Sequence, residues 1–194
     1  MALKASGAKI ELREILLRDK PAEMLLISEK GTVPVLQLPS GHVLDESYDI
    51  MHWAVQQEDP YAWLAFDKQQ LAEIKQLVFM NDFEFKGYLD HYKYADRYPQ
   101  HSQDFYRQQG EGFLQKLEVR LKQNRYLMAD KVSLADIAIM PFIRQFAYVD
   151  IHWFDSSPYQ NLRKWLNEFL ESELFLSIMP KYPPWKKGCI PIYV

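Results

Sequence analysis

The sequence predicts two parts of different fold class, an α/β domain followed by an all-helical domain. Over residues 1–57, short apolar runs of strand-like character alternate with glycine and proline turns and with helical stretches. From Asp67 onward apolar residues recur every three or four positions, which is typical of helices that bury one side. We therefore expect a first domain at residues 1–57, a linker at 58–66 marked by Asp59–Pro60, and a helical domain with an extended tail at 67–194.

The first elements are expected in the order helix, strand, helix. Residues 1–6 are compatible with a short helix, and residues 9–16 alternate apolar and charged side chains as a strand does. Asp19 is placed to cap a second helix that has Pro21 in its first turn and ends at Gly31.

A hairpin and a helix start follow, and they carry the chemistry of this domain. Val33–Leu36 is a β-prone run, and turn residues join it to a second strand at Val43–Leu44. If the Val33–Pro34 peptide bond is cis, the backbone of Val33 faces outward and can pair with an extended peptide. The unpaired N–H groups of a helix that begins at Ser47 favour a carboxylate. The alternative reading is a hairpin and a capped helix with no ligand.

The second part is expected to contain only helices before its tail. Apolar spacing predicts a long helix over residues 67–98, another over 102–124 and a strongly apolar one over 137–149. A further helix begins near Ser157–Pro158, and a short one ends near Met179. The tail at 189–194 is apolar and β-prone.

Ser133 and Asp136 form an S-x-x-D pattern at the start of the apolar helix. The Ser133 side chain can accept from the Asp136 N–H, and the Asp136 carboxylate can accept from the Ser133 N–H. This capping box fixes a helix start, and we interpret both residues as structural rather than catalytic.

Composition limits the classes of function. The net charge is −3 with acids and bases interspersed, so nothing indicates nucleic acid or an anionic membrane as a partner. No apolar run has the length of a membrane span, and the N-terminal residues are not typical of a signal peptide. The single cysteine fits a reducing compartment, so we expect a cytoplasmic protein. The five histidines show no metal-binding spacing, and no metal is expected.

TVPVL, the turn after it and the (D)ES that opens a helix resemble the glutathione-binding half of the glutathione transferases. Lys20-Pro21-Ala22-Glu23 is similar to the omega-like members, and the S-x-x-D of the helical part is a second mark of the family. The resemblance covers nearly the whole chain. It implies a thioredoxin-like domain followed by an all-helical C-terminal domain.

The resemblance also implies a function and a site. The activity would be transfer of glutathione to a small electrophile, or glutathione-dependent reduction of one, in a homodimer. Val33, ahead of Pro34, would pair with the cysteinyl part of glutathione, Glu46 and Ser47 would bind its γ-glutamyl end, and Lys20 would reach toward the tripeptide. Apolar co-substrate would lie against aromatic side chains, although core packing is the simpler reading for them: Tyr88, Tyr92, Phe142 and Phe146.

One departure from the family pattern concerns the first strand and most of the first helix, which would precede Met1 together with the catalytic residue. Three explanations are open: a start assigned to an internal methionine, a truncated and inactive chain, or a tail at 189–194 that fills the place of the strand. The catalytic residue is thus unknown, and Cys189 would act only if the tail folds back. A non-catalytic module that binds a protein partner or a ligand is the alternative function.

Overall fold

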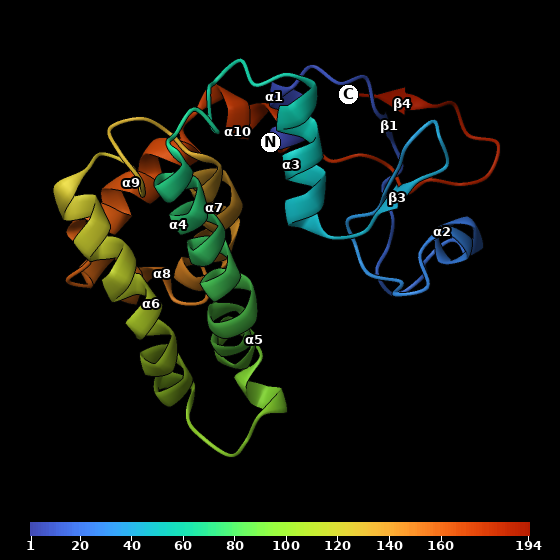
Figure 1. The fold of residues 1–194 in the computed structure, drawn as a ribbon. Helices are drawn as coiled ribbons and strands as arrows, with labels where there is room; N and C mark the ends of the chain where they lie inside the picture. Colours follow the sequence, from blue (N-terminus) through green and yellow to red (C-terminus); the bar gives the residue numbers. More distant parts are fainter. The chain divides into compact units, whose positions relative to one another are not determined.

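The computed structural model describes residues 1–194, which form two compact units (Figure 1). The first unit combines residues 1–61 with 173–194, and the second contains residues 62–172. The helical domain was expected to span 67–194, whereas residues 173–194 lie in the first unit in the structure. The reason is strand pairing, described below. No helix is long and apolar enough to cross a membrane.

The first unit contains short elements. Its helices and strands are α1 (Ala2–Ala5), β1 (Glu11–Leu12), α2 (Ala22–Ile27), β2 (Leu36–Gln37), β3 (Val43–Leu44), α3 (Ser47–Gln57), α10 (Glu173–Ser177) and β4 (Ile192–Tyr193). Helix α3 packs against α1, and a small apolar core lies on this side: Ala2, Leu36, Ile50, Ala54 and Val55.

The expected hairpin is present but shorter at its first strand. Strands β2 and β3 are antiparallel, with Leu36 opposite Leu44, and the Leu38 N–H donates to the His42 carbonyl at 2.8 Å. Val33 lies before the ladder, and the Val33–Pro34 peptide bond is cis. Gly41, in the turn, has a φ of 87°, a conformation that glycine adopts without a steric cost.

Asp19 does not cap α2, contrary to the expectation. The N-cap residue of this helix is Pro21, whose ring has no hydrogen-bonding group, and the Asp19 N–H donates to the Leu16 carbonyl at 2.9 Å. The chain makes a tight turn here, so the aspartate lies ahead of the helix start. The helix begins at Ala22 with Glu23 in its first turn.

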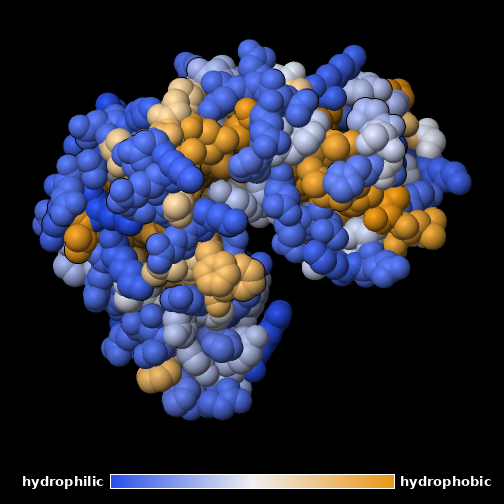
Figure 2. Space-filling model, in the orientation of Figure 1, coloured by the Kyte–Doolittle hydropathy of each residue, from blue (hydrophilic) through white to orange (hydrophobic).

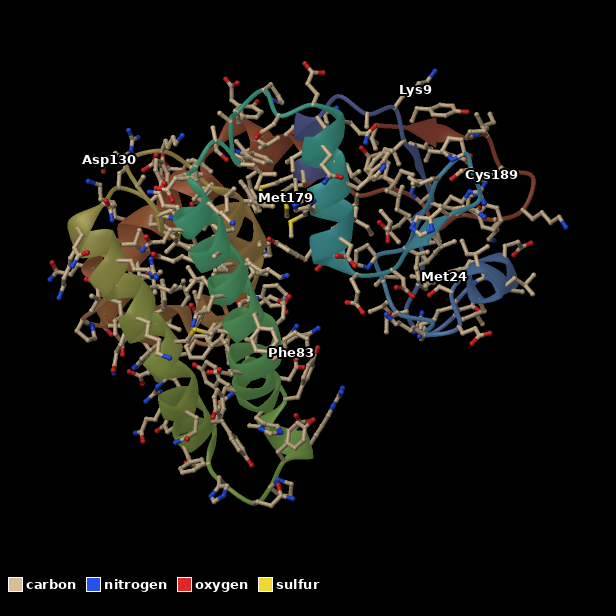
Figure 3. All side chains as sticks on the ribbon, viewed as in Figure 1. Lys9, Met24, Phe83, Asp130, Met179 and Cys189 are labelled. Atoms are coloured by element: carbon tan, nitrogen blue, oxygen red, sulfur yellow. The ribbon has the colours of Figure 1, made fainter.

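The tail forms the strand β4, which pairs antiparallel with β1. Ile10 and Val194 exchange backbone hydrogen bonds of 3.0 and 3.4 Å, and the Trp185 N–H donates to the Glu14 carbonyl at 2.7 Å. Lys9, labelled in Figure 3, lies over the ring of Tyr193 at 4.8 Å. These contacts place the tail in the first unit.

Apolar side chains are also exposed on the first unit. Leu17, Leu26 and Ile190 are the most exposed of its large apolar residues, and Figure 2 shows orange atoms on the visible face of this unit. Helix α2 accordingly contains no buried residue.

The regular elements of the second unit are all helices. It contains α4 (Lys68–Met80), the π-helix η1 (Asn81–Phe85), α5 (Lys86–Lys93), the 3₁₀-helix η2 (Ala95–Arg97), α6 (Gln103–Gln123), α7 (Leu134–Ala147), α8 (Ile151–Ser156) and α9 (Gln160–Leu170). The long helix expected over 67–98 runs without a break through α4, η1 and α5 but ends at Lys93, and the 3₁₀-helix η2 follows. Helix α8 was not expected. Asp67 and Ser102 cap α4 and α6 with their side chains.

The capping box at Ser133 is present and fully buried. The Asp136 carboxylate accepts hydrogen bonds from the backbone N–H groups of Ser133 and Leu127, both at 2.9 Å. It also accepts from the indole N–H of Trp165 at 2.9 Å. One buried carboxylate thereby joins the start of α7 to the preceding loop and to α9, which confirms the structural interpretation of this motif.

Candidate functional site

The start of helix α3 leaves donors open. Its first backbone hydrogen bond runs from the Ile50 N–H to the Glu46 carbonyl at 3.0 Å, so the N–H groups of Ser47, Tyr48 and Asp49 have no backbone partner. The N-cap residue is Glu46, and no side chain caps the helix. In an eleven-residue helix these N–H groups carry the positive end of the helix dipole. The arrangement fits a carboxylate of a ligand.

A charged cluster lies beside this helix start. The Lys30 ammonium donates to Glu46 Oε1 at 2.7 Å and to Asp45 Oδ1 at 3.1 Å. The Ser28 hydroxyl donates to Asp45 Oδ2 at 3.2 Å. Hydrogen bonding to Lys30 holds the pKa of the Asp45 carboxyl below its ordinary value, and the two carboxylates raise the pKa of Lys30. Asp45 and Lys30 are therefore both charged at neutral pH.

Val33 offers a free backbone. Its N–H and C=O take part in no hydrogen bond of the chain, and the residue is 45% exposed. An exposed, unpaired backbone segment can pair with an extended peptide in the manner of an added strand. Pro34, which follows it, is exposed as well. The backbone of Val33 is thus available for the pairing with an extended peptide that the sequence predicts.

Lys20 is exposed and forms no ion pair within the chain. Its ammonium lies near the backbone of Gly31, since a Cβ built on that glycine would be 4.0 Å from it. Lys20 is thus close to the loop that leads to Val33, but no contact with Glu46 or Ser47 is formed.

Lys30, Asp45 and Ser28 were not singled out as site residues from the sequence. The signal for Lys30 is weak, because a lysine in a turn is most often a solvated surface residue. Only the fold brings it to the two carboxylates, which are 15 and 16 positions further along the chain.

No thiol or hydroxyl is identified as a catalytic group. Ser6 is buried and its hydroxyl donates to the Leu3 carbonyl at 3.0 Å. Cys189, labelled in Figure 3, is exposed in the tail of the first unit. Of the aromatic residues considered for a co-substrate, Tyr92 and Phe146 are core residues that pack on each other at 4.8 Å between ring centroids. No group of three or more His, Cys, Asp or Glu side chains is arranged to hold a metal ion.

The residues of the first unit fit the head group of an α-amino acid. Its carboxylate matches the open N–H groups at Ser47, and its ammonium matches the carboxylate of Glu46. A peptide attached to that head group could pair with the backbone of Val33. The donors of this unit therefore match a peptide that carries an α-amino acid head group.

Two family models match parts of this chain. Residues 1–61 match the model of the glutathione S-transferase N-terminal domain, and residues 87–168 match that of the C-terminal domain. Among solved structures, a ternary complex of BphK, a bacterial glutathione S-transferase, is 24% identical over 91% of this chain and 88% of its own, with a TM-score of 0.73.

Two further structures have the same fold. A class Gtt2 glutathione S-transferase of Vibrio parahaemolyticus is 20% identical, with a TM-score of 0.73 and coverage of 91% of this chain and 88% of its own. Glutathione S-transferase-I bound with lactoylglutathione is 19% identical, with a TM-score of 0.72 and the same coverage of 91% and 88%. The fold is thioredoxin-like in its N-terminal part and helical in its C-terminal part, and the chain belongs to the glutathione S-transferase family.

Proposed function

We propose that this chain binds glutathione through Val33, Pro34, Glu46, Ser47 and Lys20, and that it transfers glutathione to, or uses it to reduce, a small electrophile. The observation that carries the proposal is the open start of α3 beside the carboxylate of Glu46. This pairing of free N–H groups with an acidic side chain recognises both charges of a γ-glutamyl head group. The solved relative that contains lactoylglutathione supports the choice of ligand class.

The residues of this site bind and orient the tripeptide. The N–H groups at Ser47 and the Ser47 hydroxyl hold the α-carboxylate, and Glu46 holds the α-ammonium. The backbone of Val33 pairs with the cysteinyl unit and fixes its direction. Each neutral contact contributes about 1 kcal/mol and a charge-assisted one somewhat more. The group that stabilises the thiolate is not assigned.

Calorimetric titration with glutathione tests the binding step. We expect saturable binding and a rise in melting temperature, because a ligand that binds only the folded state stabilises it. Ser47→Ala should weaken binding roughly fivefold to tenfold through loss of one hydroxyl hydrogen bond. Ser40→Ala, in the β2–β3 turn, is the matched control and should bind as the wild type does. If the well-folded wild type shows no binding at millimolar glutathione, the proposal is wrong.

Turnover separates the proposal from its alternative. The probes are 1-chloro-2,4-dinitrobenzene for transfer and bis(2-hydroxyethyl) disulfide for reduction. Binding without turnover of either probe would favour a non-catalytic module that binds a ligand or a protein partner. This alternative is supported by the position of Cys189, the single thiol of the chain, which is exposed in the tail.

The assembly and location belong to the same proposal. We expect a homodimer in the cytoplasm, without nucleic acid or membrane partners. Sedimentation velocity of the purified chain tests the dimer, and a monomer at micromolar concentration would contradict it.

A further inference from the structure

Lys30 is held toward the start of α3 by a tight turn. The Gly31 N–H donates to the Ser28 carbonyl at 3.1 Å, and Gly31 adopts a φ of 60°. A Cβ on Gly31 would lie 3.2 Å from Leu25 Cδ2, so this turn packs closely against the end of α2. The backbone next to Lys30 is therefore fixed, and its ammonium reaches both Asp45 and Glu46.

The two carboxylates are not equivalent. Asp45 has two partners, Lys30 and the Ser28 hydroxyl, and its side chain is 28% exposed. Glu46 has Lys30 as its partner, and its side chain is 63% exposed. The contact between Lys30 and Glu46 can therefore be exchanged for another cation while Lys30 keeps its contact with Asp45.

The net charge around Glu46 favours binding of a further cation. Two carboxylates share one ammonium, and Asp49 adds a further negative charge in the first turn of α3. The site therefore attracts the ammonium group of a ligand, but the Glu46 carboxylate is already paired with Lys30. The energy gained from the new ion pair is reduced by the one that it replaces.

We propose that Lys30 is a specificity-determining residue: in the free protein its ammonium occupies the Glu46 carboxylate that pairs with the α-ammonium of the ligand, and it thereby limits how strongly the protein selects ligands that carry that group. This inference rests on the proposed glutathione site and adds a residue to it. Lys30 does not touch the reacting sulfur in this scheme, and its effect is on selection between ligands.

The test compares two ligands that differ in the α-amino group alone. These are S-methylglutathione and its analogue with a glutaryl group in place of γ-glutamyl, each titrated calorimetrically into the full chain. The readout is the dissociation constant of the glutaryl analogue divided by that of S-methylglutathione. Overall changes in charge or affinity act on both ligands, and the ratio isolates the contribution of the ammonium group.

In Lys30→Met we expect the ratio to rise roughly threefold over the wild type, the scale of one exposed ion pair. In Glu46→Gln the ratio should fall toward one, because the pairing carboxylate is gone. Lys30→Arg keeps the cation and should keep the wild-type ratio. Lys4→Met, which removes an exposed lysine of the same unit, is the matched control and should leave the ratio unchanged.

Two outcomes overturn the inference, and they are distinguishable. If the wild type binds S-methylglutathione and Lys30→Met has the wild-type ratio, the role of Lys30 is wrong and the glutathione site stands. If the wild type binds neither ligand, the proposed function fails and the inference fails with it. Melting temperatures show that each variant is folded, and the exposed position of Lys30 predicts little change in them.

Discussion

At Gly110, helix α6 approaches α7 so closely that a ring fills the place of a side chain. A Cβ built on Gly110 would lie 2.5 Å from Cε2 of Phe146, and Phe146 is fully buried. The phenyl ring also packs on Phe85 and Tyr92, so it has no free space to move into. Glycine lowers helix propensity, but packing requires it at this position.

Gly110→Ala should destabilise the protein by about 1–3 kcal/mol, the cost of overpacking a filled core. Gly112→Ala lies in the same helix with nothing within 4 Å of its Cβ, so it should be neutral or stabilising by about 0.5–1 kcal/mol. Urea unfolding of both variants measures the difference. Equal stabilities would contradict the packing argument.

Some residues of the candidate site can be predicted from local sequence, and others cannot. Val33, Pro34 and Ser47 lie in a short motif whose turn chemistry is local, and the backbone N–H groups of Val33 and Ser47 have no backbone partner in the chain. Lys30 was missed because its two partners are distant in the chain. Charge pairs of this kind are set by the fold and have no periodic signature.

Among the elements, α9 depends on a residue from another helix. No side chain of its own caps it, and its N-cap residue is Tyr159. The buried carboxylate of Glu118, on α6, accepts from the Leu162 N–H at 2.9 Å and from the Asn161 side-chain amide at 2.8 Å. A long-range carboxylate thus replaces the local cap.

Glu118→Ala should cost about 1–3 kcal/mol, because the Leu162 N–H loses its acceptor in a buried position. Glu118→Gln keeps one acceptor oxygen and should cost less. Lys116→Ala, exposed on the same helix, should stay within about 0.5 kcal/mol of the wild type. Denaturant midpoints for the three variants give the comparison, and an Ala variant as stable as the Lys116 control would refute the capping role.

The helices also show where periodicity succeeds and where it stops. Caps at Asp67, Ser102 and Ser133 are local, and the helices begin within one residue of them. The π-helical stretch η1 keeps the same apolar side toward the core, so the sequence pattern does not reveal it. Helix α8 has six residues, which is too short for a periodic signal.

At the scale of the whole molecule, buried phenols couple stability to alkaline pH. Burial raises the pKa of Tyr92, Tyr126 and Tyr159 to about 12 each. An unfolded chain ionises its tyrosines near pH 10. The folded protein therefore holds these protons to higher pH, so the stability that the three phenols contribute is complete below about pH 10 and is lost as the pH rises toward about 12.

We expect the urea midpoint to fall steadily between about pH 10 and 12. Tyr92→Phe should make this fall shallower, because one raised pKa is removed. Tyr193→Phe, at an exposed tyrosine of the tail, should leave the slope unchanged. A midpoint independent of pH over this interval would contradict the assignment.

The sequence by itself determined the division into an α/β part and a helical part, the hairpin turn, the start of α3 and the capping box at Ser133. These features depend on turn residues, caps and apolar spacing that act over a few positions. The tertiary structure alone decided that the tail pairs with β1, that Lys30 meets Glu46 and that Glu118 caps α9. Strand partners, ion pairs and caps between distant segments depend on which segments the tertiary fold brings together. Local propensity acts over a few residues and does not determine those contacts.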